Sequence, residues 1–210
     1  MRRPWLLAAV LLALWGGWSW WHARPLHPGP GELAPDDPVQ AALDGPMEPF
    51  RLGDFRLTPR ARFGLVARVL STENYRFDKG AALAPEDFAL GWGRMSDSAV
   101  LQGIDISQSG RFYYWHVRQF PIPRREIETH SANMHLIPAD AGVRRTLERV
   151  RAGQVVALDG FLVDADRADG WHWRTSLTRD DTGDGACELF YVTSVDMPAG
   201  QAAPAPPEPQ

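Results

Sequence analysis

The chain has only one cysteine, Cys187, among its 210 residues. A single thiol cannot form a disulfide within the chain, and it excludes paired-cysteine motifs such as CxxC. Because oxidising compartments permit disulfides without requiring them, this scarcity does not restrict where the protein resides. We expect Cys187 to be a buried thiol that packs as a small hydrophobic side chain.

The sequence also lacks an excess of positive charge and the common catalytic motifs. Its formal net charge is −4 and Lys79 is its only lysine, so no overall basic field attracts nucleic acid, and we expect no nucleic-acid partner. The HExxH zinc motif and the GxSxG nucleophile motif are both absent. The Asp-Gly-Asp-Thr run of the staphylococcal nucleases is absent as well.

What the sequence does have is an apolar start. Arg2 and Arg3 precede an uncharged run over residues 4–21 that is rich in tryptophan at its far end. As a helix this run would span about 27 Å, slightly less than a hydrocarbon core of about 30 Å. The arginines favour a cytoplasmic N-terminus, and the tryptophans match an aromatic belt. We therefore expect residues 1–21 to be a signal anchor in the bacterial inner membrane, with the C-terminal domain in the periplasm.

A cleaved signal peptide, which would release the domain into the periplasm, is the alternative. Cleavage requires small residues at positions −3 and −1, and a cut after Ala23 would put Trp21 at −3. The triplet Gly17-Trp18-Ser19 fits better but lies inside the apolar run. The uncleaved anchor is therefore our first interpretation.

Proline density sets the remaining domain boundaries. Prolines recur through residues 22–50, which predicts a semi-extended linker that holds the domain off the membrane. Residues 198–210 are rich in proline and alanine and are predicted to be disordered. The folded domain is then expected over residues 51–197.

Hydrophobic patterns predict a mainly β domain with one principal helix. The helix is expected over residues 139–153, with Asp140 as its N-cap. A shorter helix is predicted over residues 83–93 from Pro85 and the acidic residues that follow it. Strands are predicted over residues 63–71, 98–107, 111–120, 154–165, 171–178 and 187–195, with a hairpin turn at 108–110. A small OB-like β-barrel fits this order, because an OB barrel carries a helix between its third and fourth strands.

Three stretches together resemble a known group of proteins: WGRMSD (92–97), HSANMHLIPAD (130–140) and SLTRDDTGDGACE (176–188). They are similar to uncharacterised proteobacterial proteins that are predicted to be periplasmic with a single membrane span. The resemblance implies a location and a domain extent over most of residues 60–195. It implies no activity and no catalytic residue.

The candidates for chemistry are few and isolated. His130 and His135 could bind zinc only if the chain bends between them, since five positions along a strand place them on opposite faces. Ser131 beside His130 suggests a nucleophile and a base, but neighbouring strand residues also point to opposite faces. Asp180, Thr182 and Asp184 match part of a calcium loop, yet Tyr191 stands where the loop needs a glutamate. We therefore commit to no catalytic residue, no metal and no cofactor, and keep zinc and calcium as alternatives.

Aromatic and basic residues offer a binding surface instead. Exposed aromatic side chains next to arginines are typical of surfaces that bind proteins or glycans. The function expected from the sequence is a membrane-anchored binding module of the cell envelope, with an envelope protein or glycan as its partner. A periplasmic metal-dependent hydrolase that uses His130, His135 and nearby acids is the alternative. The candidate binding residues are Arg111, Trp115, Arg118, Asn133, Trp171 and Trp173.

Overall fold

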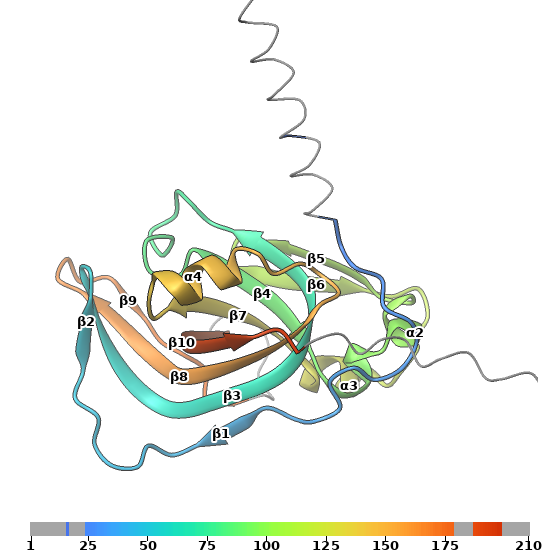
Figure 1. Cartoon of the computed structure of the whole chain (residues 1–210), viewed down its shortest axis with the longest axis horizontal. Coiled ribbons are helices and arrows are strands. Elements are labelled where there is room, and N and C mark those ends of the chain that lie inside the picture. The colour runs from blue at the N-terminus through green and yellow to red at the C-terminus, as the bar shows by residue number, and fades with distance from the viewer. Residues whose placement is uncertain (1–15, 17–23, 179–186, 199–210) are drawn as a thin grey trace, which may run out of the picture.

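The computed structural model describes residue 16, residues 24–178 and residues 187–198. These residues form a mainly β fold with few helices (Figure 1). The strands are β1 (Val39–Ala41), β2 (Phe50–Leu52), β3 (Phe55–Asn74), β4 (Glu86–Gly91), β5 (Asp105–Ser109), β6 (Phe112–His116), β7 (Ser131–Pro138), β8 (Val155–Arg167), β9 (His172–Trp173) and β10 (Glu188–Asp196). The helices are η1 (Gly93–Ser96), α2 (Ser98–Leu101), α3 (Arg124–Thr129) and α4 (Ala141–Leu147).

The expected anchor and the expected disordered tail fall almost entirely outside the described residues. Within the part of the chain that is described, no helix has both the length and the apolar character needed to cross a membrane.

Five strands pair along a path that returns to its starting strand. β3 pairs with β4, and β4 pairs with β7, both antiparallel. β7 pairs in parallel with β10, and β10 pairs antiparallel with β8. β8 then pairs antiparallel with β3. The return is achieved because β3 is long and curved: its first part pairs with β8 and its last part with β4 (Figure 1).

The main hydrophobic core lies on one side of these strands, here called the inner face. Phe88 of β4, Met134 of β7 and Phe190 of β10 are fully buried there. α4 adds Val143 and Leu147 to the same core, as its apolar stripe predicted. The Asp140 side chain accepts hydrogen bonds from the backbone N–H groups of Gly142 and Val143, which confirms the predicted N-cap.

Several predicted elements are confirmed, and three are wrong. The hairpin exists as β5 and β6, and the strands predicted over residues 154–165 and 187–195 are β8 and β10. The helix predicted over residues 83–93 is instead the strand β4, because this segment hydrogen-bonds to β3 on one edge and to β7 on the other. Residues 98–107 begin as α2, capped by the Asp97 side chain, and of residues 171–178 only His172 and Trp173 form a strand.

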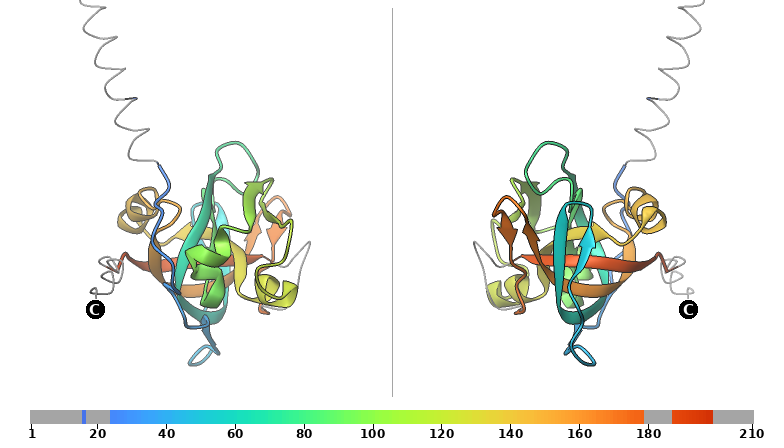
Figure 2. Two further views of the ribbon diagram at one scale, coloured as in Figure 1. Left: turned by 90° about the vertical axis from the view of Figure 1, so that its right-hand side faces the viewer. Right: turned by 90° about the vertical axis from the view of Figure 1, so that its left-hand side faces the viewer.

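The proline-rich segment is not a detached linker. Residues 24–41, here called the strap, lie along the domain past α2 and β3 (Figures 1 and 2). Leu26 N donates to Ala152 O at 2.8 Å, and the Ser96 hydroxyl accepts from Leu33 N and Ala34 N. β1, at the end of the strap, pairs with β3. Residues 24–41 are therefore not the free spacer that was expected. Each proline removes only its own N–H group, and the residues between the prolines form hydrogen bonds with the domain.

Gly153 makes the docking of the strap possible. Its φ is 91°, and a Cβ atom there would lie 2.0 Å from the Leu26 carbonyl oxygen. Gly170 has a similar φ of 88° but open space around its Cα. A side chain would strain the backbone at both glycines, but it would collide with a neighbouring residue only at Gly153.

We expect Gly153→Ala to destabilise the protein more than Gly170→Ala. Both variants carry the left-handed penalty of about 1–2 kcal/mol, but only Gly153→Ala also displaces Leu26. Urea denaturation would measure the free energy of unfolding, and limited proteolysis would report release of the strap. Equal losses with no new cleavage between residues 24 and 41 would contradict this account.

Candidate functional site

A polar cluster lies on the outer face of β4 and β7, opposite the main core. Asp87 and His135 are register partners on these strands, and their neighbours Phe88 and Met134 point to the inner face. Because strand side chains alternate, Asn133 shares the face of His135. Asp87 is fully buried, and His135 is 2% exposed.

Arg111 reaches this cluster from the tip of the β5–β6 hairpin. Gly110 and Arg111 both have positive φ, 61° and 75°, which a two-residue hairpin turn of the mirror-image type requires. Among the described residues, Arg111 is the only non-glycine with this conformation. An arginine held there pays a steric penalty, so its side-chain contacts must offset that cost.

The Arg111 guanidinium joins two loops to the sheet. It donates to Asp87 Oδ1 at 2.9 Å, to both carboxylate oxygens of Asp78 at 2.9 Å, and to Ala84 O at 2.8 Å. It also lies over the Tyr75 ring, 3.6 Å from the ring centroid. Cation–π contact and charge-assisted hydrogen bonds both stabilise a partly buried guanidinium.

Asp87 is the centre of the cluster. Besides Arg111, its carboxylate has Asn133 Nδ2 at 3.3 Å and His135 Nδ1 at 2.9 Å. The approach to His135 is short but falls outside the angular range of a hydrogen bond. Asn133 in turn accepts from Gln108 Nε2 at 2.7 Å and donates to Arg111 O at 3.1 Å. The hairpin is thus bound to the outer face by polar contacts.

A pocket of about 320 Å³ opens beside this cluster. The Trp173 ring lies against the His135 ring, with 4.4 Å between their centroids. The Nδ1 edge of the imidazole faces Asp87, and His135 contributes to the pocket lining. The pocket is lined by Arg111, Phe112, His135, His172, Trp173, Arg174 and Cys187.

The structure brings four of the predicted binding residues together and separates two. Arg111, His135 and Trp173 line the pocket, and Asn133 donates a hydrogen bond to the backbone oxygen of Arg111. Trp171 packs edge-to-face on Trp173 at 5.9 Å. Trp115 and Arg118 belong elsewhere: Trp115 packs on Phe120 beside a separate core cluster, and Arg118 is exposed.

His130 and Ser131 are not part of this site. The His130 ring lies against Gly93, and its Nε2 is 3.8 Å from Asp37. The Ser131 hydroxyl donates to Ile127 O at 2.6 Å and contacts the Tyr113 hydroxyl. β7 runs from residue 131 to 138 without a break in register, so the chain does not bend to bring His130 toward His135.

The candidate metal residues receive no structural description. Asp180, Thr182 and Asp184 lie outside the described residues. Within the described ranges, no three histidine, cysteine or acidic side chains gather as they would around a metal ion.

Sequence reasoning missed Asp87 and misjudged Cys187. Asp87 was hidden by the helix predicted over residues 83–93, and EDFALG has no alternation of apolar and polar residues that would indicate a strand. Cys187 is half-buried and lines the pocket, whereas a buried packing role was expected. The residue that precedes β10 could have been placed beside β7 only from the parallel pairing of those strands.

Comparisons with known proteins do not extend this description. No protein-family model matches the chain, and searches of curated proteins and of solved structures find no match either. The resemblance noted in the sequence therefore stays a prediction.

Burial perturbs three ionisable groups near the site. Burial and the Asp87 carboxylate raise the pKa of Tyr75 to about 12. Burial also raises the pKa of Tyr113 to about 12, although its hydrogen bond with Ser131 opposes the shift. Both phenols therefore remain neutral, and the Tyr75 hydroxyl accepts a hydrogen bond from Arg111 N at 3.1 Å. Burial and the nearby Glu148 raise the pKa of Glu86 to about 7, while Arg144 opposes the shift.

We expect Asp87→Asn to lower the free energy of unfolding by about 3 kcal/mol, since it leaves a partly buried Arg111 with one fewer counter-charge. The exposed pair of Arg174 and Asp166, at 2.6 Å, gives the control, and Asp166→Asn should cost no more than about 1 kcal/mol. Urea denaturation measures both variants. Similar losses would show that the Asp87 cluster is not a major source of stability.

Glu86 makes stability depend on pH. Its pKa is raised on folding, so its contribution is fully present below pH 4.5 and is lost as pH rises through about 7. Glu86→Gln should leave stability unchanged at pH 4 and raise it at pH 8 by roughly 2–3 kcal/mol. The exposed Glu48→Gln variant is the control. A Glu86→Gln gain that is the same at both pH values would contradict the shift.

Proposed function

We propose that the protein is a membrane-anchored binding module of the bacterial cell envelope. In this proposal residues 1–21 anchor the chain in the inner membrane, and an OB-like barrel in the periplasm binds an envelope protein or glycan. The observation that carries the proposal is the pocket beside Trp173, whose wall is fixed by the Arg111–Asp87–His135 contacts.

The strand connections support an OB-like barrel. The closed path β3-β4-β7-β10-β8 uses the five long or central strands, and α4 falls between β7 and β8. These are the third and fourth strands of the path in chain order, which is where an OB barrel has its helix. β1, β2, β9 and the β5–β6 hairpin are then additions to that barrel.

The position of the pocket supports binding. OB folds bind ligands on the face of their second and third strands, between the loop after strand one and the loop after strand four. Here those strands are β4 and β7. Tyr75 and Asp78 come from the first loop, and Trp173 and Arg174 come from the second. Aromatic rings with nearby guanidinium groups suit a ligand that offers a flat apolar surface and an acidic or hydroxyl group.

A hydrolase that uses His135 is the second candidate, and one observation favours it. A carboxylate beside Nδ1 is the arrangement that orients a histidine base, and Cys187 lines the same pocket. His130, which the metal-dependent version requires, lies against Gly93 instead. Stoichiometric zinc in the purified full chain would favour the metal-dependent version over both other proposals.

Site-specific photo-crosslinking in intact cells tests the binding proposal. A photoreactive phenylalanine analogue at His172, an exposed residue of the pocket rim, should yield an adduct of defined mass. The same group at Val66, which is 40% exposed on β3, is the positional control. Trp173→Ala should abolish the adduct at His172. Identical patterns from the two positions, or an adduct that persists without Trp173, would contradict the proposed pocket.

A further inference from the structure

The start of the strap fixes one end of the domain close to the proposed anchor. Leu26 is hydrogen-bonded to Ala152, which lies in the turn between α4 and β8. Leu26 is five positions after Trp21, and five positions of chain can span at most about 18 Å. If residues 4–21 cross the bilayer, this turn lies near its surface. Figure 2 shows the start of the strap and α4 on the same side of the domain.

This end of the domain carries three arginines besides Arg144, which is paired with Glu148. Among the described residues, Arg145, Arg149 and Arg151 have no carboxylate oxygen within 4.0 Å, the limit used for an ion pair. Arg144 is different, because its Nε lies 3.1 Å from Glu148. The acidic groups at this end include Asp140, which caps α4 and interacts with the charge of Arg145, and the exposed Glu32 and Asp196 in the strap and at the end of β10. Arg149 and Arg151 therefore have no carboxylate partner among the described residues, on a chain whose net charge is −4.

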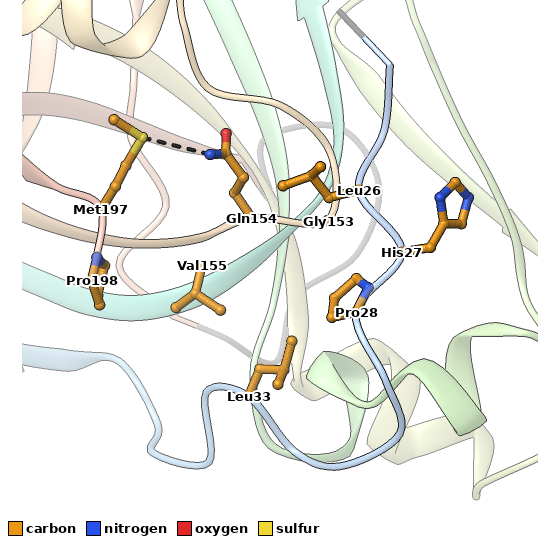
Figure 3. A pocket seen from close by; sticks show the side chains of 9 residues that line it. All are labelled: Leu26, His27, Pro28, Leu33, Gly153, Gln154, Val155, Met197 and Pro198. Carbon is orange, nitrogen blue, oxygen red and sulfur yellow. Dashed lines mark hydrogen bonds between the residues drawn. The ribbon is translucent and has the colours of Figure 1, made fainter. Parts of the chain in front are cut away.

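An apolar hollow adjoins these arginines. Its volume is about 420 Å³, and it lies between the strap, the start of β8 and the end of β10 (Figure 3). Leu26, Leu33, Val155 and Met197 supply its apolar wall. Gly153 and Gln154, which directly follow the arginine-bearing turn, line it as well. A turn that carries arginines and leads directly into the wall of an apolar hollow matches a molecule with an anionic head and an apolar body.

We propose that this end of the domain is a docking surface for anionic phospholipid of the membrane that holds the anchor. Arg145, Arg149 and Arg151 contact the lipid phosphates, and the hollow receives the apolar part of a lipid. The inference rests on the proposed membrane anchor, and it adds that the domain lies against the bilayer in one orientation. An arginine near an anionic surface strengthens such an association about fivefold, so the three together are expected to contribute on the order of 100-fold.

The test uses the full chain in vesicles. A Cys187→Ser, Ala152→Cys protein carries a fluorophore at residue 152, and the vesicles contain a lipid whose headgroup quenches it. With phosphatidylglycerol present we expect strong quenching, and with phosphatidylcholine alone weak quenching. The triple variant Arg145→Gln, Arg149→Gln, Arg151→Gln should reduce the first value to the second.

A charge-matched control separates this surface from net charge. The triple variant Arg51→Gln, Arg56→Gln, Arg118→Gln removes three exposed arginines elsewhere and should keep the quenching. Circular dichroism checks that both variants are folded. The docking surface is refuted if quenching is the same with and without phosphatidylglycerol. It is also refuted if both triple variants lose quenching equally.

Failure of the anchor would give a different result. A chain that alkaline carbonate extracts from the vesicles refutes the anchor, whatever the quenching. A chain that resists extraction but shows no lipid-dependent quenching refutes the docking surface alone.

Discussion

The buried carboxylate of Asp87 is the constraint on which the outer half of the fold depends. A charge without water must be met by partners within the protein. Arg111 provides the counter-charge from a hairpin tip that only a positive φ allows, and the same guanidinium holds Asp78. His135 and Asn133 complete the surroundings. One carboxylate therefore positions a hairpin, a loop and two side chains of a neighbouring strand.

This dependence also explains which parts of the fold the sequence could predict. α4 was readable because its cap and its apolar stripe are local features, and the hairpin was readable because its turn is local. β4 was not, since its helix-like start is overridden by hydrogen bonding to strands that are distant in the sequence. The strap was misjudged for the same reason. Its prolines indicate that the segment cannot form a helix of its own, but they do not show whether it forms hydrogen bonds with residues that are distant in the sequence.

The candidate site was predictable only in its components. Arg111, Asn133, His135 and Trp173 could each be named from the sequence, but apart from Asn133 and His135 on β7 no spacing links them, because they lie on three segments. The local argument correctly excluded one arrangement: strand alternation predicted that His130 would meet neither Ser131 nor His135, and it does not. Asp87, which contacts Arg111, Asn133 and His135, had no visible role until β4 and β7 were paired.

The strap has a mechanical consequence. If residues 1–21 anchor the chain in a membrane as proposed, residues 24–41 add no length between anchor and domain while they are bound to the domain, and their release would add roughly 60 Å. The hydrogen bonds of the strap therefore control how far the domain can move from its anchor. While the strap is bound, an anchored domain would stay within a thin layer next to the membrane. Once the strap is released, the domain could reach partners much farther from that membrane.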